Sequence, residues 1–199
     1  MLKPAVCLAL VIFGIHGLWP RTALRHPPGV LVAAEPEQHL IPEKRLGDVR
    51  GFALSAVATY SVQARVLHTK RYWADGADLV PFDVALGWGP MSDQAVLDKL
   101  RVTQGNRFFF YEWRDAPPLP EKEIACHAAN NHIISASAKV AKTIRGLRAG
   151  QVVKLRGYLV NATKPGGFRW PTSLSRTDTG NGACELFYVE SAQVEDDVI

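Results

Sequence analysis

The feature of this sequence that most constrains its fold is an alternation of apolar and polar residues over residues 55–66. Ala56, Tyr60, Val62, Ala64 and Val66 occupy one set of positions, and Ser55, Thr59, Ser61, Gln63 and Arg65 occupy the other. A period of two predicts a β-strand with one face in a core and one face in water. Residues 80–88 repeat the pattern, with Asp83 turned away from the apolar face. The chain should therefore be built on half-buried strands.

The rest of the chain predicts more strands than helices. Ser92 and Ser137 are typical N-caps of short helices, and 16 Gly with 13 Pro leave much of the chain to turns. Further strands are expected at 106–114, 151–160, 168–174 and 183–194. We therefore predict a mainly β (α+β) fold with two or three short helices. A small antiparallel barrel, for which the oligonucleotide/oligosaccharide-binding (OB) fold is one option, fits this order, and a two-layer α+β sheet is the alternative.

The N-terminus predicts an export signal or a membrane anchor. Residues 5–19 hold a single histidine as their only polar residue, and the run is shorter than the ~20 residues that a transmembrane helix normally uses. Lys3 and Arg21 can lengthen the span by reaching the headgroups. Bulky residues and a proline stand where a signal peptidase needs small ones. We therefore expect residues 1–24 to remain as a single-pass membrane helix that enters the inner membrane through residues 2–19. Cleavage and release into the periplasm is one alternative, and a buried hydrophobic helix is the other.

Three segments follow from this N-terminus. After the 1–24 signal-anchor, the prolines and charged residues of 25–50 predict a stiff tether, because proline fixes φ and removes backbone donors. Residues 51–195 then form one β-rich globular domain, consistent with a soft prior of ~150 residues per domain. Export would place this domain in the periplasm.

Charge and motifs exclude several function classes. The formal net charge is +4, but residues 1–34 contain three basic residues and no acidic one, so the body is nearly neutral. Proteins that hold nucleic acid usually concentrate Lys and Arg on one face, so nucleic acid is not the expected partner. The sequence has neither a phosphate-binding nor a dinucleotide-binding glycine pattern, and no Gly-x-Ser-x-Gly elbow. We expect no cofactor.

Four segments resemble parts of a known family: 26–31, 83–93, 155–160 and 183–186. The run Gly-Trp-Gly-Pro-Met-Ser-Asp over 87–93 is the most specific of them. Together they resemble a family of uncharacterised proteobacterial envelope proteins with one N-terminal hydrophobic segment. The resemblance implies an anchored protein that faces the periplasm. It implies no activity and no catalytic residue.

One candidate binding surface mixes basic and aromatic side chains. Its members are Arg156, Tyr158, Phe168, Arg169 and Trp170. Such a mixture is typical of platforms for single strands or glycans. The alternative is a hairpin whose Phe and Trp pack on the body of the domain.

One segment could hold a metal ion. His127 and His132 are five residues apart, and Asp83 or Glu123 could complete a site with them. On a continuous helix the two histidines would point about 140° apart, so the site requires a break between them. The alternative is that one histidine caps a helix and the other forms a hydrogen bond in a loop.

The remaining expectations concern cysteines and function. Cys126 and Cys184 are the cysteines of the exported body, where an oxidising compartment would allow a disulfide between them. The favoured function is a membrane-anchored, periplasm-facing binding or assembly module of the envelope, with an envelope protein complex as a candidate partner. The alternative is a small metal-dependent hydrolase that uses the region of His127 and His132.

Overall fold

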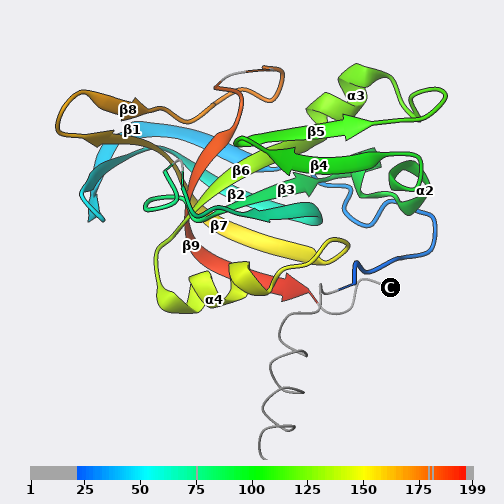
Figure 1. Cartoon of the computed structure of the whole chain (residues 1–199), viewed down its shortest axis with the longest axis horizontal. Coiled ribbons are helices and arrows are strands. Elements are labelled where there is room, and N and C mark those ends of the chain that lie inside the picture. Colours follow the sequence, from blue (N-terminus) through cyan, green and yellow to red (C-terminus); the bar gives the residue numbers. More distant parts are fainter. Residues whose placement is uncertain (1–21, 75, 179, 181, 196–199) are drawn as a thin grey trace, which may run out of the picture.

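The computed structural model describes residues 22–74, 76–178, 180 and 182–195 (Figure 1). The strands are β1 (Glu37–Val49), β2 (Phe52–Arg71), β3 (Phe82–Gly87), β4 (Arg101–Gly105), β5 (Phe108–Glu112), β6 (Ala128–Ser135), β7 (Val152–Lys164), β8 (Phe168–Trp170) and β9 (Glu185–Glu195). The helices are the 3-10 helix η1 (Gly89–Ser92), α2 (Gln94–Leu97), α3 (Glu121–Cys126) and α4 (Ala138–Gly146). The mainly β class with short helices is confirmed.

The predicted membrane segment lies outside the described residues. Among the residues described, no helix has both the length and the apolar character to cross a bilayer.

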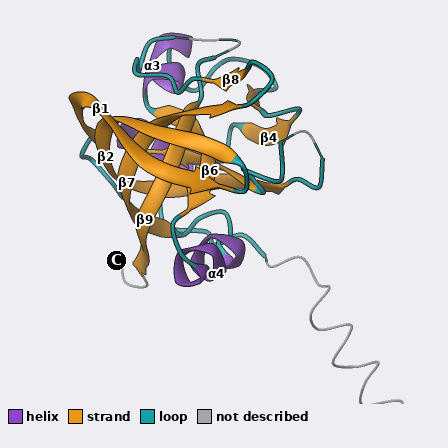
Figure 2. Cartoon of the chain, turned by 90° about the vertical axis from the view of Figure 1, so that its left-hand side faces the viewer, coloured by secondary structure: helices purple, strands orange, loops and turns teal. Residues whose placement is uncertain are grey.

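Seven of the strands form one sheet that closes on itself. Their order is β1-β2-β3-β6-β9-β7-β8, and β2 also pairs with β7. This second pairing joins β2, β3, β6, β9 and β7 into a ring of hydrogen-bonded strands (Figures 1 and 2). Every neighbouring pair is antiparallel except β6 and β9, which run parallel. The predicted antiparallel arrangement thus holds for every neighbouring pair except this one.

The alternation seen in the sequence puts one face of β2 against apolar neighbours along its length. In the ring, Tyr60 and Val62 pack with Phe187 and other buried residues. Near the start of β2, Leu54 packs instead with Ile134 and Leu186. Because Phe187 faces the ring interior, Leu186 beside it must face outward. The long β2 thus contributes to two cores, one inside the ring and one against its outer surface.

A separate unit is inserted between β3 and β6. It comprises η1, α2, the β4–β5 hairpin and α3, and its apolar side chains pack on Leu67 and Ala85. In both views α3 lies above the ring and α4 lies below it (Figures 1 and 2). The insertion therefore covers part of the outer face of β3 and β6 and leaves a hollow at its edge.

The predicted tether over 25–50 is wrong, because most of this stretch belongs to the folded body. Residues 37–49 form β1, which pairs with β2. Pro42 is tolerated because β1 is an edge strand and its register is irregular between Leu40 and Lys44.

The residues before β1 are fixed to the body by one of the segments that carry the family resemblance. Ser92 Oγ accepts hydrogen bonds from the amides of Leu31, at 3.1 Å, and Val32, at 3.0 Å. Asp93 Oδ1 accepts another from the amide of Gly29, at 2.9 Å. Two resembling segments, 26–31 and 83–93, thus contact each other directly.

Of the two serines predicted to be helix N-caps, one is an N-cap and the other is not. Ser137 caps α4 through its hydroxyl, which accepts from the Val140 amide at 3.2 Å, as predicted. Ser92 does not cap α2. Asp93 does, with its carboxylate 2.8 Å from the Ala95 amide, because the Ser92 hydroxyl is engaged by the N-terminal segment.

Candidate functional site

A pocket of about 430 Å³ opens where the β4–β5 turn, the outer face of β6 and the β7–β9 connection meet. We call it the Trp170 pocket. The residues that matter for its chemistry are Arg107, Phe108, His132, Arg169, Trp170 and Cys184. They come from four segments far apart in the sequence.

The floor of the pocket contains a buried Asp83–His132 pair. The two residues are register partners on β3 and β6. Both project outward, because Val84 and Ile133 beside them face the ring interior. His132 Nδ1 lies 2.9 Å from Asp83 Oδ1, and both side chains are almost inaccessible to water. A carboxylate only accepts, so Nδ1 carries the proton in this bond and Nε2 is left for another partner.

Arg107 completes this buried group from the β4–β5 turn. Its Nη1 donates to Asp83 Oδ1 at 3.0 Å and to the Val80 carbonyl at 2.9 Å. Its guanidinium also stacks on the Tyr72 ring, with Cζ 3.9 Å from the ring centroid. Burial, and then the charge of Asp83, raise the pKa of Tyr72. The Tyr72 hydroxyl therefore remains a donor at neutral pH.

The turn that presents Arg107 is strained. Asn106 and Arg107 have φ angles of 50° and 68°, in the left-handed region that side chains with a Cβ disfavour. Each such residue costs on the order of 1–3 kcal/mol unless its surroundings hold it. Here the Arg107 amide donates to the Tyr72 hydroxyl at 3.1 Å, and the Arg107 carbonyl accepts from Asn130 Nδ2 at 3.0 Å. The backbone is thus fixed on both sides, which sets the direction of the side chain.

A second chain of hydrogen bonds continues from Asn130 to His68 on one side and to Cys184 on the other. His68 Nδ1 lies 2.9 Å from Gln104 Oε1, and Gln104 donates through Nε2 to Asn130 Oδ1. Asn130 Nδ2 also lies 3.6 Å from Cys184 Sγ. Burial raises the pKa of Cys184 to about 11, so this side chain is a neutral thiol at physiological pH. It lines the pocket without being an activated nucleophile.

Trp170 forms one wall. Its ring lies edge-on to His132, with 5.1 Å between the centroids. A Cβ at Gly76 would come within 3.0 Å of the Trp170 ring, and Gly76 has a φ of +80°, so glycine is required there for two reasons. The neighbouring Arg169 is exposed. The pocket therefore combines an indole wall, two guanidinium groups and an imidazole.

The structure brings together residues that the sequence analysis had assigned to competing sites. Arg169 and Trp170, from the expected binding surface, share the pocket region with His132 and Asp83, from the expected metal site. The other expected binding residues lie elsewhere. Arg156 is on β7 opposite Ser61 and Ser191.

Two further aromatic residues of that expected surface have their own partners. Tyr158 lies beneath Lys44, whose Nζ is 5.8 Å from the ring centroid. Phe168 packs edge-on against Phe52 at 5.4 Å. The expected surface is therefore not a single site.

The expected metal ligands are also separated. His127 Nδ1 lies 2.8 Å from the Glu123 carbonyl and 3.4 Å from its carboxylate, at the end of α3. His132 lies further along β6, roughly 15 Å away at ~3.3 Å per residue. In the part of the chain described, no three His, Cys, Asp or Glu side chains gather as a metal site would require.

Cys126 and Cys184 are both free thiols. The disulfide expected from the compartment is not part of this structure.

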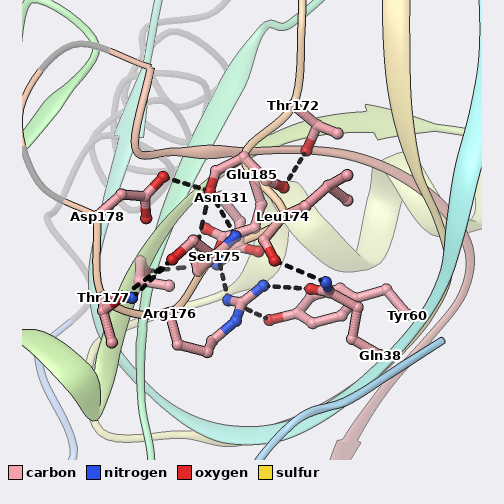
Figure 3. Close-up of polar contacts among 12 residues, drawn as sticks. Gln38, Tyr60, Asn131, Thr172, Leu174, Ser175, Arg176, Thr177, Asp178 and Glu185 are labelled. Atoms are coloured by element: carbon pink, nitrogen blue, oxygen red, sulfur yellow. Dashed lines mark hydrogen bonds and ion pairs between the residues drawn. The ribbon is translucent and has the colours of Figure 1, made fainter. Parts of the chain in front are cut away.

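A second polar cluster holds the β7–β9 connection to the ring (Figure 3). Arg176 pairs with the buried Glu185, and its guanidinium also reaches the Tyr60 hydroxyl at 3.4 Å and Gln38 Oε1 at 2.6 Å. Burial raises the pKa of Glu185 to about 7, although Arg176 opposes the shift. Because Trp170 and Cys184 belong to the same connection, this cluster helps to position two walls of the Trp170 pocket.

The sequence analysis missed Arg107, Asn130 and Tyr72. Arg107 could not be recognised from the sequence, because a single basic residue in a turn belongs to no known motif. Asn130 gave no usable signal either, because the need of a buried amide for a partner appears only once the strand around it is known.

Comparison with protein-family models, with curated proteins and with solved structures finds no match to this chain.

Proposed function

We propose that this protein is a membrane-anchored, periplasm-facing binding module of the bacterial envelope, built on an OB-type barrel, whose ligand is an acidic saccharide bound in the Trp170 pocket. The support for the barrel type is the topology. Counting only ring strands, β2, β3, β6, β7 and β9 are the first to fifth, and they close in the order first-second-third-fifth-fourth-first. The third and fifth are parallel, and α4 lies between the third and the fourth.

The observation that carries the proposal is the position of the pocket in this topology. OB folds bind oligosaccharides and oligonucleotides on the face of the second and third strands, between the loops that join strands one to two and four to five. Here those strands are β3 and β6, which supply Asp83 and His132. The loop between strands four and five supplies Arg169, Trp170 and Cys184 to the lining. The loop between strands one and two holds Tyr72, which stacks on Arg107. This position of the pocket supports an OB-type ligand site.

The charge of the pocket favours an anionic ligand. The positive charge of Arg107 is matched by the buried Asp83. Arg169 forms no ion pair with any described residue. A carboxylate accepts two parallel hydrogen bonds from a guanidinium, and a sugar ring presents C–H groups that pack on an indole. An acidic saccharide meets both groups, whereas the nearly neutral body does not favour nucleic acid.

The proposed location rests on the N-terminal apolar run. Leu24 already donates from its amide to the Ala149 carbonyl at 2.8 Å, so little chain separates the proposed anchor from the body. A protein held this close to the inner membrane would meet envelope saccharides and envelope complexes at its surface. We expect the full chain to stay in carbonate-washed membranes, with its body cleaved by a protease added to spheroplasts.

Calorimetry on the full chain in phosphatidylcholine nanodiscs tests the ligand class. Oligogalacturonates should bind and neutral galacto-oligosaccharides should not. Arg169→Ala should weaken binding about tenfold, as expected for loss of a charged hydrogen bond. Arg156→Ala is the matched control, because it removes an exposed arginine of the same expected surface that lies away from the pocket. Equal losses in both variants, tighter binding of oligothymidylate, or no binding of any acidic sugar would refute the proposal.

A further inference from the structure

A second hollow, the arginine groove, lies between the β1–β2 turn, the start of the β2–β3 connection and α4. Its volume is about 770 Å³, and the residues that define it are Arg50, Arg71, Trp73, Asp78, Phe82 and Arg145. It shares no lining residue with the Trp170 pocket. It is therefore a separate place on the molecule.

The groove has an excess of positive charge. None of Arg50, Arg71 and Arg145 forms an ion pair with a described residue. The one carboxylate in the lining is Asp78, which accepts from the Leu79 amide at 3.1 Å. Arg50 donates to the Asp78 carbonyl at 2.9 Å and not to its carboxylate. Three guanidinium groups thus line one hollow with a single carboxylate.

One of these arginines is held against an exposed indole. Trp73 is 78% exposed. Arg71 stacks on it with Cζ 3.6 Å from the ring centroid and also lies 5.7 Å from the centroid of Phe82. The stacking orders the guanidinium before any ligand arrives, which lowers the entropy lost on binding. An indole this exposed still has apolar surface available to a ligand.

We propose that the arginine groove binds the phosphate group of an organic ligand whose apolar part lies on Trp73. A phosphate monoester carries a charge of about −1.5 to −2 at pH 7, which matches three guanidinium groups offset by one carboxylate. Arginine is the side chain best suited to phosphate, because its planar group donates two parallel hydrogen bonds. The phosphate can come from a soluble phosphorylated sugar or from a lipid headgroup. This site does not depend on the function proposed for the Trp170 pocket.

The experiment uses the full chain in phosphatidylcholine nanodiscs with glucose 6-phosphate and glucose as soluble probes. Glucose 6-phosphate should bind and glucose should not. Arg71→Gln and Arg145→Gln should each weaken binding about tenfold, the effect of losing one charged hydrogen bond. Lys142→Gln is the matched control, because it removes one charge from the same helix at an exposed position outside the groove. It should leave the affinity within about twofold.

A lipid arm distinguishes the two sources of phosphate. Nanodiscs that contain phosphatidic acid, whose headgroup is a phosphate monoester, should shift the side-chain Nε–H resonances of Arg71 and Arg145, but not that of Arg114, if the ligand is a headgroup. That shift without glucose 6-phosphate binding supports the site with a lipid source, and the reverse supports it with a soluble source. The proposal is overturned if the phospholipid causes no shift and glucose 6-phosphate does not bind. A loss in Lys142→Gln as large as in Arg145→Gln also overturns it, because general charge attraction would then explain the binding.

Discussion

Removal of Arg107 should destabilise the fold far more than removal of an ordinary surface arginine. In Arg107→Ala, the carboxylate of Asp83 stays fully buried and loses its guanidinium partner, while its second oxygen already has no partner among the described residues. Breaking a buried ion pair in this way costs about 3–5 kcal/mol. Loss of the stacking on Tyr72 adds about 1 kcal/mol. The strained φ does not contribute, because Arg and Ala meet the same restriction there.

The same hairpin offers a matched control. Arg101 and Glu112 form an ion pair at 3.6 Å with side chains that are 77% and 63% exposed. Exposed pairs contribute ~0–1 kcal/mol, so Arg101→Ala should be nearly neutral. Urea unfolding of the full chain in detergent, followed by near-UV circular dichroism, gives both free energies.

A double variant tests whether the buried charge is the cause. Asp83→Asn keeps an oxygen that can accept from His132 but removes the negative charge. In the Arg107→Ala background it should recover about 2 kcal/mol, a coupling typical of contacting residues. If Arg107→Ala unfolds no more easily than Arg101→Ala, or if the double variant recovers nothing, the buried pair does not stabilise the pocket floor as argued.

Two further predictions concern single titratable groups. Burial raises the pKa of Glu185 to about 7 in the folded state, above the 4.5 of a free side chain, so the stability it contributes is complete below about pH 4.5 and is lost as the pH rises through 7. Melting temperatures across this range should show a fall in the wild type that Glu185→Gln lacks, and parallel curves would contradict the assignment. Burial also raises the pKa of Cys184 to about 11, so iodoacetamide at pH 8 should alkylate Cys184 in the folded protein far more slowly than in the unfolded protein. Equal rates in mass spectrometry would show that this thiol is not protected.

Sequence patterns predicted those elements whose local signal agrees with their place in the fold. The alternation in β2 and the Ser137 cap of α4 are examples, since burial on one face and a free amide at a helix start both leave a mark on the sequence. β1 was missed because its proline and its charges resemble a tether. An edge strand with a bulge tolerates both, and nothing local distinguishes the two cases.

Ring closure was beyond local prediction. It depends on β2 being long enough to pair with β1 and β3 at different positions along one edge while β7 pairs with its other edge. The parallel pairing of β6 with β9 joins residues more than fifty positions apart. Such contacts are set by the packing of the whole sheet, so the sequence analysis could name a closed antiparallel arrangement as an option but could not derive its order.

The strand that the sequence analysis missed most completely, β6, lies beside both polar clusters. Asn130, Asn131 and His132 hid β6, because three polar residues in succession do not indicate a buried strand. In the structure they alternate between its two faces. Asn130 and His132 point outward to the network of Arg107 and Asp83, while Asn131 faces the ring beside its register partner Glu185. Burying a polar group costs free energy unless a partner compensates its desolvation. Asn130 and His132 have such partners, whereas Asn131 donates to the Ala129 carbonyl at 3.4 Å and its Oδ1 has no partner among the described residues. One side of the strand is the floor of the Trp170 pocket and the other is the cluster that holds the β7–β9 connection in place. β6 therefore joins the floor of the Trp170 pocket, through His132, to β9, the strand that carries Glu185.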